Sequence, residues 1–266
     1  MKHSDYSHQK NTLKFDRSVW VPQALKIEEA IKLEPILKKY LVKKGIDFKS
    51  KEALRLYNLL IAREKYDLDL ELPKNALTPT SPLRFAFLKE TIKPKNDVLE
   101  IGTGASAIIA LLAAKHFNAK VFATEKDPQL YEYARLNVKK NRLEDRVKII
   151  PVEKNNVIKG IIGEYVKFDA ILSNPPWYKE KETRGKAFSG KTHELSDQTL
   201  SFQIVKDGVE FLKKEGIIAL LLSTKHQERI KKLENQMKKL KLKTTLIKLT
   251  AGKRTRAILI GKRKIY

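Results

Sequence analysis

The sequence predicts an α/β protein whose core is a doubly wound, largely parallel sheet. From about residue 79 onward, short apolar runs typical of strands alternate with stretches typical of helices. Such alternation is characteristic of parallel strands joined by crossover helices. Two further apolar runs close the chain and are joined only by a short basic turn at residues 251–254. This ending predicts a hairpin and therefore one antiparallel strand.

The chain of 266 residues is long enough for one large domain with an appendage. We expect an N-terminal helical, basic region over residues 1–78 and the main α/β domain over residues 79–266. Because residues 1–20 are polar and irregular, we expect a flexible arm there.

Two helices are expected to follow this arm. The first covers residues 27–43 and is interrupted by Pro35, and the second covers residues 51–66 with Ser50 as its N-terminal cap. Alternating leucines over residues 67–73 then predict a possible edge strand.

The main domain is expected to contain seven strands with helices between them. The strands are predicted at residues 98–101, 120–124, 147–150, 168–173, 217–222, 244–249 and 255–260. The helices are predicted from the first glycine-rich turn to about residue 117 and at residues 130–141, 200–214 and 225–240.

A glycine-rich turn follows the first of these strands, in the run Glu100-Ile101-Gly102-Thr103-Gly104-Ala105-Ser106. Glycine lets the backbone turn tightly and approach a ligand, and the next helix should present free N–H groups at its N-terminus. Glu125 ends the following strand, twenty-three residues after Gly102. An acid at that place suits a bidentate contact with ribose hydroxyls, although a surface glutamate in a charged loop would look the same.

Two cofactor classes fit this layout. A dinucleotide site expects a third small residue, which Ala107 supplies, but the carboxylate of Glu100 would repel a pyrophosphate. S-adenosylmethionine carries no phosphate and has a cationic sulfonium, so an acid beside the glycines is compatible with it. We therefore favour a methyltransferase over a dehydrogenase.

The run Asn174-Pro175-Pro176-Trp177 follows the strand expected at residues 168–173. An asparagine amide can both accept from and donate to a planar NH2 group. The two prolines stiffen the corner and leave only carbonyls, and the tryptophan offers a face for stacking. The run suits holding an exocyclic amine, yet by itself it is equally consistent with an ordinary turn at a strand exit.

Charge is the second strong signal in the sequence. The chain has 55 Lys and Arg against 31 Asp and Glu, a net charge of +24. Residues 225–266 hold fifteen Lys and Arg and two Glu, so this segment carries +13. A clustered excess of one sign predicts a polyanionic partner, although a solvated lysine-rich surface is an alternative. An anionic membrane is a weaker alternative because residues 222–249 lack interleaved aromatic side chains.

Composition also excludes several kinds of site. Without cysteine there is no disulfide, no thiolate nucleophile and no cysteine-based metal site. The five histidines are scattered without metal-ligand spacing, so we expect no metal. With no run of membrane-spanning length and no signal peptide, we expect a cytoplasmic protein that does not bind membranes, and we expect a monomer.

Several of these segments together resemble a known family. They are residues 79–84 (Pro-Thr-Ser-Pro-Leu-Arg), 100–106, 123–125, 173–177 and 252–256. The chain resembles the RlmF-type adenine-N6 methyltransferases of large-subunit ribosomal RNA and their relatives that modify small nuclear RNA. The resemblance covers most of residues 46–260. It implies a Rossmann-like class I methyltransferase fold, with S-adenosylmethionine as the cofactor and RNA as the partner.

The resemblance also implies roles for individual residues. Arg84 would hold the methionine carboxylate of the cofactor, a charge-assisted pair suited to a guanidinium. The other implied cofactor-binding residues are Glu100, Gly102, Thr103, Gly104, Ser106, Glu125, Asn156 and Asn174. The implied catalytic residues are Asn174, Pro175, Pro176 and Trp177. The implied RNA-binding residues are Lys10, Lys14, Arg17, Lys49, Lys253, Arg254 and Arg256.

The implied reaction is direct methyl transfer to N6 of an unpaired or flipped adenine in a structured RNA, either ribosomal or small. The carbonyls of Asn174 and Pro175 would accept the two N6 protons, with Trp177 stacked on the base. Alignment of the reactants would then supply most of the rate gain.

Two departures from the family and three rival functions remain. Relatives usually carry Phe at the position of Trp177, and residues 188–195 match their Gly-Gly-Glu-Leu segment only loosely. The rivals are a protein-glutamine methyltransferase, an RNA-binding protein without activity, and a DNA adenine methyltransferase.

Overall fold

The computed structural model describes residues 13–43, 45–74, 76, 78–153, 156–176 and 199–264. Its main feature is an eight-stranded sheet with strand order β1-β9-β10-β8-β7-β4-β5-β6. All neighbouring strands are parallel except that β10 runs antiparallel to both β8 and β9. The predicted α/β class and closing hairpin are therefore confirmed.

The strands are β1 (Arg17–Trp20), β2 (Leu41–Val42), β3 (Gly45–Ile46), β4 (Asp97–Ile101), β5 (Lys120–Glu125), β6 (Val147–Pro151), β7 (Phe168–Ser173), β8 (Leu212–Ser223), β9 (Leu242–Ala251) and β10 (Arg254–Arg263). The α-helices are α1 (Ile27–Leu33), α2 (Lys51–Tyr66), α3 (Ser81–Thr91), α4 (Ile108–Phe117), α5 (Pro128–Lys140), α6 (Leu200–Gly208) and α7 (Gln227–Lys239). Two 3-10 helices are η1 (Pro35–Tyr40) and η4 (Val209–Phe211).

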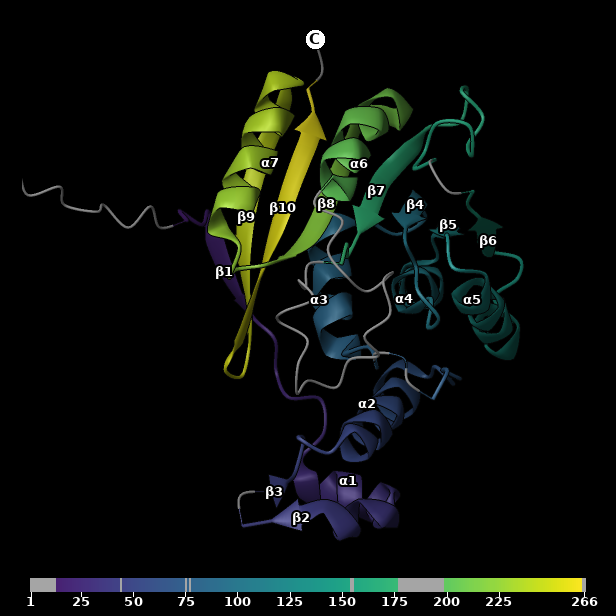
Figure 1. The fold of residues 1–266 in the computed structure, drawn as a ribbon, viewed down its shortest axis with the longest axis vertical. Helices are drawn as coiled ribbons and strands as arrows, with labels where there is room; N and C mark the ends of the chain where they lie inside the picture. Colours follow the sequence, from purple (N-terminus) through teal and green to yellow (C-terminus); the bar gives the residue numbers. More distant parts are fainter. Residues whose placement is uncertain are drawn as a thin grey trace, which may run out of the picture.

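Helices cover both faces of the sheet (Figure 1). On one face, α3, α4 and α5 bury apolar side chains in a core that includes Phe87 and Ala134. On the other face, α6 and α7 bury a second core that includes Ile204 and Leu233. The central strands β4 and β7 are buried at every position except Asp97 and Asp169, as expected for strands covered on both faces.

The order in which the chain adds strands to the sheet reverses between β4 and β7, although the two strands run parallel. From β4 the chain proceeds outward through β5 and β6, and it then returns to place β7 on the other side of β4. Ile101 lies opposite Ser173 in this pairing, and the Ser173 hydroxyl donates to the Ile101 carbonyl at 2.9 Å. Open α/β sheets bind ligands at the carboxyl ends of their strands at such a switch point.

The N-terminal helices lie beyond the same edge of the sheet. Figure 1 shows α1 and α2 on the side toward which β7 points, and the turn joining β9 to β10 also reaches that side. As predicted, the Ser50 side chain caps α2, with its hydroxyl accepting from the backbone N–H of Ala53 at 3.2 Å. The proposed division of the chain at residue 78 remains a prediction.

The flexible arm expected over residues 1–20 is wrong for its last part, because residues 17–20 form β1 at the edge of the main sheet. Trp20 lies opposite Thr250 of β9, and Val21 extends the pairing by donating to the Thr250 carbonyl at 2.8 Å. Asp16 fastens the entry to the strand, since its carboxylate accepts from the backbone N–H of Leu246 at 2.7 Å. The β-branched and aromatic residues here have the composition of a strand.

Three other expectations are corrected by the structure. Residues 67–73 form an extended segment but no strand, because asparagine side chains of α5 pair with it instead of a second backbone. A helix that the sequence did not reveal, α3, begins at Ser81 with Pro82 in its first turn, a favoured place for proline. The helix expected at residues 200–214 ends at Gly208, and β8 begins earlier than expected.

Phe87 offers a test of the core that positions α3. Its side chain is fully buried between α3 and the sheet, so we expect Phe87→Ala to lower the free energy of unfolding by about 3–5 kcal/mol. Tyr165 is 96% exposed, and we expect Tyr165→Ala to change stability by less than about 0.5 kcal/mol. Urea unfolding of both variants measures the difference, and equal losses would contradict this packing.

Candidate active site at the carboxyl edge of the sheet

The loop after β4 takes a shape that only glycine adopts easily at two positions. Gly102 and Gly104 have φ angles of +73° and +66°. A Cβ at either position would meet no atom within 4 Å, so the loop has open space on that side. The N–H groups of Gly102 and Thr103 both donate to the Thr124 carbonyl, at 3.0 and 2.9 Å. These bonds tie the loop to the end of β5.

Glu100 lies beneath this loop and holds it to α4. Its side chain is only 2% exposed, and one carboxylate oxygen accepts from the Thr103 hydroxyl at 2.8 Å and from the Ala110 N–H at 3.0 Å. Burial raises the pKa of Glu100 to about 7, and nearby Glu125 raises it further while Arg84 opposes the increase. Through its hydrogen bonds with Thr103 and Ala110, the Glu100 carboxyl group supports the loop.

The start of α4 is less open than the sequence suggested. The Ala110 N–H is used by Glu100, and the Ile108 N–H donates to the Ser106 hydroxyl at 3.3 Å. Ala107 precedes the helix with a positive φ of +48°. The prediction that the N-terminus of this helix presents free N–H groups is thus wrong for these two groups.

Glu125 stands at the tip of β5 with its carboxylate fixed in place. One oxygen accepts from the Gly104 N–H at 2.8 Å, and the other accepts from the Lys126 and Asp127 N–H groups at 2.8 and 2.9 Å. Burial raises its pKa, while these hydrogen bonds act in the opposite direction. Because a carboxylate offers about four acceptor positions, there is room for about one further donor. The contact with ribose remains a prediction.

The run Asn174-Pro175-Pro176-Trp177, here called the tetrapeptide, comes directly after β7. The loop at residues 102–106, here called the glycine loop, comes directly after the neighbouring strand β4. Asn174 and Pro176 are half-buried, and Pro175 is buried. Adjacent strands lie about 4.8 Å apart, so the end of β7 is a near neighbour of the end of β4. Trp177 lies outside the described residues, and its stacking role remains a prediction.

The other predicted cofactor residues come from different elements at this edge. Arg84 lies in the first turn of α3 rather than in a loop, is half-buried, and is close enough to Glu100 to influence its pKa. Asn156 follows β6 and is exposed. The structure thus brings Arg84, Glu100 and Glu125 to one neighbourhood, and the role of Asn156 remains a prediction.

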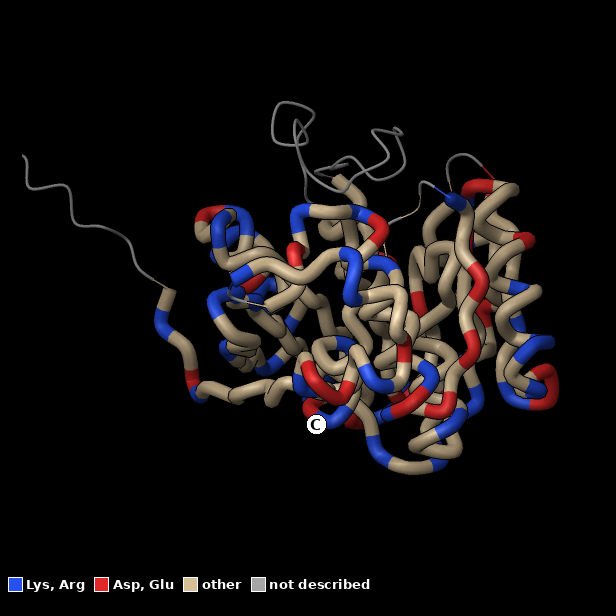
Figure 2. Tube along the Cα trace, turned by 90° about the horizontal axis from the view of Figure 1, so that it is seen from below, with Lys and Arg blue, Asp and Glu red and all other residues tan. Residues whose placement is uncertain are grey.

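The predicted RNA-binding residues lie in three separate places. Lys253, Arg254 and Arg256 belong to the β9–β10 hairpin, and the first two are exposed. Lys14 and Arg17 lead into β1 from its amino end, and Arg17 pairs with Glu90 of α3. Lys49 lies exposed in the turn before α2, whereas Lys10 lies outside the described residues. Figure 2 shows Lys and Arg spread over much of the described chain, with Asp and Glu between them.

Trp20 is a candidate RNA contact that the sequence did not reveal. It ends β1 beside Thr250, and 63% of its surface is exposed although indole is costly to expose. Because β1 runs parallel to β9, the Trp20 side chain lies where these two strands reach their carboxyl ends, which is also where the hairpin turn lies. The signal was the strand-like composition of residues 17–20, which the polar residues before them concealed.

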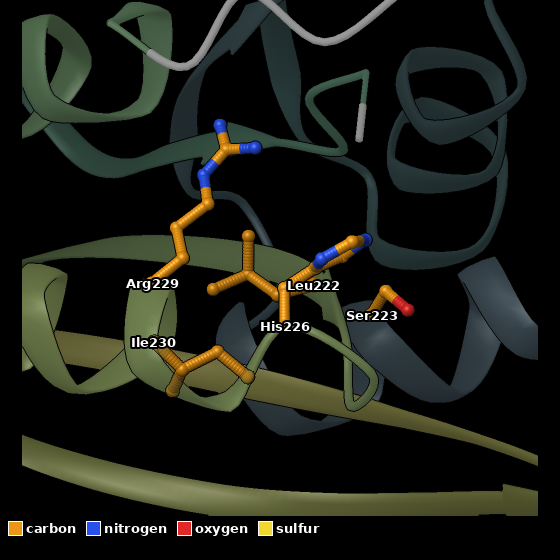
Figure 3. Close-up of a pocket in the computed structure, with 5 residues that line it drawn as sticks. All are labelled: Leu222, Ser223, His226, Arg229 and Ile230. Carbon is orange, nitrogen blue, oxygen red and sulfur yellow. The ribbon is translucent and has the colours of Figure 1, made fainter. Parts of the chain in front are cut away.

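A small pocket adjoins the end of β8, the strand next to β7. It is lined by Leu222, Ser223, His226, Arg229 and Ile230. Figure 3 shows Arg229 reaching across from α7, and its guanidinium donates to the buried Ser201 hydroxyl at 2.8 Å. None of the residues predicted for the cofactor or the target base lines this pocket.

In the part of the chain that the structure describes, no group of three or more His, Cys, Asp or Glu residues could hold a metal ion. No helix in that part is long and apolar enough to cross a membrane.

Comparison with known proteins identifies similar methyltransferases. A family described as RNA methyltransferase matches residues 23–219. A putative methyltransferase of Methanocaldococcus jannaschii is 42% identical over 89% of this chain and 98% of its own length. The RNA N(6)-adenosine-methyltransferase METTL16 of mouse is 30% identical over 53% of this chain, which corresponds to 28% of the mouse protein.

A solved structure is similar over nearly the whole fold. The crystal structure of a methyltransferase from Pyrococcus furiosus is 31% identical, with a TM-score of 0.70 over 82% of this chain and all of that one. The predicted Rossmann-like class I methyltransferase fold is therefore confirmed, as is the resemblance to RNA methyltransferases.

The cofactor of these methyltransferases is S-adenosylmethionine, and the residues at this edge fit it. The open side of Gly102 and Gly104 leaves room for a ligand against the backbone. Glu125 and Glu100 place acids beside that space, which suits a ligand with a sulfonium and an amine. Arg84 would hold the carboxylate of such a ligand.

Glu100 should make the stability of the protein depend on pH. Its folded pKa of about 7 lies above the usual 4.5, so the folded state binds its proton more tightly than the unfolded state. Stability should therefore fall as pH rises from about 4.5 to about 7 and then level off. Glu100→Gln keeps an acceptor for Thr103 and Ala110, and at pH 8 it should be about 2–3 kcal/mol more stable than the wild type.

Urea unfolding between pH 5 and pH 8 measures this difference. Glu132→Gln, which changes a carboxylate that is 66% exposed on α5, is the matched control and should follow the wild type. A Glu100→Gln variant that kept the slope of the wild type would rule out Glu100 as its source.

Proposed function

The chain belongs to this RNA methyltransferase family, and on that premise we propose that it methylates N6 of an unpaired or flipped adenine in a structured RNA. One observation carries the proposal. The pairing of Ile101 with Ser173 sets the glycine loop beside Asn174 and Pro175, so a cofactor on the loop and an amine on the tetrapeptide would lie next to each other. Reactants held in such proximity gain most of their rate from alignment.

The residues after β7 suit an aromatic amine. The Asn174 amide oxygen and the Pro175 carbonyl are two acceptors at one strand end, and they match the two protons of the adenine N6 group. Accepting both protons holds the amine and turns its lone pair toward the methyl donor. S-adenosylmethionine, when bound, supplies an electrophilic methyl group. No base is needed before transfer because the proton can leave afterwards.

The choice of adenine is supported by a relative of the chain. The mouse protein with 30% identity is named for N6 methylation of adenosine in RNA, although this chain spans 28% of its length. We extend that specificity to this chain because Asn174-Pro175-Pro176 offers the acceptors that such a reaction needs. Whether the substrate is ribosomal RNA or a small RNA is decided by identifying the methylated molecule.

The same edge of the sheet provides a path for the RNA. Lys253 and Arg254 stand in the exposed hairpin turn, and Trp20 is exposed on β1, which pairs with β9 of the same hairpin. Cations hold phosphates, and a flat indole stacks with an unpaired base. We further propose that residues 1–78 act as an RNA-binding region. We also propose that the protein is a monomer, which light scattering of the purified protein tests. We propose that it acts in the cytoplasm, which the location of a tagged copy in cells tests.

Two rival functions differ from the proposed one in their substrate, and the third, an RNA-binding protein without activity, would transfer no methyl group. A protein-glutamine methyltransferase would use the same amide-holding residues, and a DNA adenine methyltransferase the same base. Incubation of the enzyme and labelled S-adenosylmethionine with RNA, DNA and protein fractions separates them. We expect label in RNA, recovered as N6-methyladenosine after nucleoside analysis. Label confined to protein or DNA would refute the proposed substrate.

Asn174 is the residue on which the reaction should depend most. Asn174→Ala removes an acceptor aimed at the amine, so we expect kcat for RNA methylation to fall at least about a hundredfold. Asn174→Asp keeps an acceptor oxygen and should retain more activity than Asn174→Ala. Thermal unfolding of both variants serves as the control for folding, because Asn174 is itself among the residues expected to bind the cofactor. Near-normal methylation by a well-folded Asn174→Ala variant would remove the amine-holding role.

The hairpin should contribute to RNA affinity through charge. We expect the double change Lys253→Ala/Arg254→Ala to weaken RNA binding and to reduce the slope of log K against log salt by about 1–2. Lys239→Ala/Lys241→Ala removes the same charge from exposed positions where α7 ends, at the opposite edge of the sheet, and should do less. Equal effects of the two pairs would mean a general field rather than a local contact.

The same titration tests Trp20. If the indole stacks with a base, Trp20→Ala should weaken RNA binding by about tenfold and Trp20→Phe should restore most of it. An unchanged affinity of Trp20→Ala would exclude Trp20 from the RNA path.

A further inference from the structure

Asn137 of α5 joins two parts of the chain that are far apart in sequence. Its side chain is fully buried, and its amide oxygen accepts from the Glu71 N–H at 2.7 Å. Its amide nitrogen donates to the Glu71 carbonyl at 2.8 Å and to the Ala105 carbonyl at 2.8 Å. Ala105 belongs to the glycine loop, so one side chain connects that loop to the segment at residues 67–73.

Asn141, one helical turn further along, pairs with the same segment in the same way. Its amide oxygen accepts from the Asp69 N–H at 2.9 Å, and its amide nitrogen donates to the Asp69 carbonyl at 2.8 Å. The two amides therefore satisfy alternate residues of an extended backbone, as a neighbouring strand would. The leucines at 68, 70 and 72 are buried on the other side of the segment.

The two asparagines differ in a single hydrogen bond. The second N–H of Asn141 returns to its own helix, at the Asn137 carbonyl, at 2.7 Å. The second N–H of Asn137 instead reaches the Ala105 carbonyl of the loop. Because the neighbouring Gly104 N–H is held by Glu125, the loop is fixed from both sides at this point.

The segment is also attached to the N-terminal helices. The guanidinium of Arg55 in α2 donates to the Leu72 carbonyl at 2.6 Å and to the Pro73 carbonyl at 2.9 Å. A continuous chain of contacts therefore runs from α2 through Arg55, the segment and Asn137 to the loop. An adjustment of α2 would reach Ala105 through these hydrogen bonds and the short backbone stretch from Leu72 to Glu71.

We propose that Asn137 is a positioning residue that sets the cofactor-binding shape of the glycine loop by fastening it to the segment held by α2. Cofactor affinity then depends on how the N-terminal helices are attached. This coupling concerns the cofactor of the family and does not depend on which base or nucleic acid is methylated. Binding of the cofactor and any ligand-induced movement of the N-terminal helices would be reciprocally linked.

The matched pair Asn137→Ala and Asn141→Ala tests the proposal. Both variants lose the two hydrogen bonds to the segment, but only Asn137→Ala loses the bond to the loop. By calorimetry without RNA, we expect the Kd for S-adenosylmethionine to rise about tenfold in Asn137→Ala, the factor that one net hydrogen bond is worth, and less than about threefold in Asn141→Ala. Thermal unfolding of both variants separates this effect from general loss of stability.

Hydrogen exchange supplies a second measurement on the protein without cofactor. Amides of the loop at residues 102–106 should exchange faster in Asn137→Ala and remain protected in Asn141→Ala. Should Asn137→Ala not fold, Asn137→Ser serves instead, because its short hydroxyl cannot reach both the segment and the loop and brings no charge into this buried place. Equal losses of affinity in the Asn137 and Asn141 variants would overturn the proposal.

A double-mutant cycle tests the path through α2. Arg55→Ala should weaken cofactor binding about threefold in the wild-type background and should add little once Asn137 is alanine. Fully additive effects would disconnect Arg55 from the loop and overturn that part of the path. Since RNA is absent, a wrong assignment of the substrate changes neither result.

Discussion

The pairing of β4 with β7 is the constraint on which the rest of the site depends. Ile101 and Ser173 are neighbours in the sheet and are further joined through the Ser173 hydroxyl. Each strand is followed at once by its functional segment, so a one-residue slip would separate the two segments and turn every side chain of the slipped strand to the other face. A slip of β4 would take the buried Glu100 away from its donors on Thr103 and Ala110, and a slip of β7 would break the bond from Ser173 to Ile101. The site therefore inherits its geometry from the sheet.

The two acids beside the loop illustrate how function and architecture share the same groups. The sequence suggested that Glu100 and Glu125 bind the cofactor. The structure shows that both side chains also accept hydrogen bonds from backbone N–H groups, Glu125 from Gly104 and Glu100 from Ala110. A loop with two glycines loses much conformational freedom on folding, and these hydrogen bonds offset part of that loss. A carboxylate held in this way is already oriented when a ligand arrives, so support and binding are compatible.

The sequence predicted the sheet well because period and turn chemistry are local signals. The glycine loop, the run Asn174-Pro175-Pro176 and the final hairpin all lie where they were expected, since each is marked by residues whose backbone preferences leave few choices. Helix α3 was missed because its proline suggested a loop, although proline is favourable in a first turn. The segment at residues 67–73 was mistaken for a strand because its alternation is genuine, but its partner is a pair of asparagine side chains that no local pattern reveals.

Charge is divided between the inside and the outside of this protein. The chain as a whole carries +24, yet the carboxyl groups of Glu100 and Glu125 are buried beside the loop. A surface of one sign attracts a polyanion over a distance of about one Debye length, roughly 8–10 Å at ordinary salt, while buried groups act on their immediate neighbours with little screening. The basic hairpin and the buried acids can therefore serve ligands of opposite charge at one edge of the sheet. Neutralising the buried acids would leave the charge of the surface almost unchanged, and removing the hairpin charge would leave the acids in place. Mutations can therefore change the affinity for the cofactor and the affinity for RNA separately.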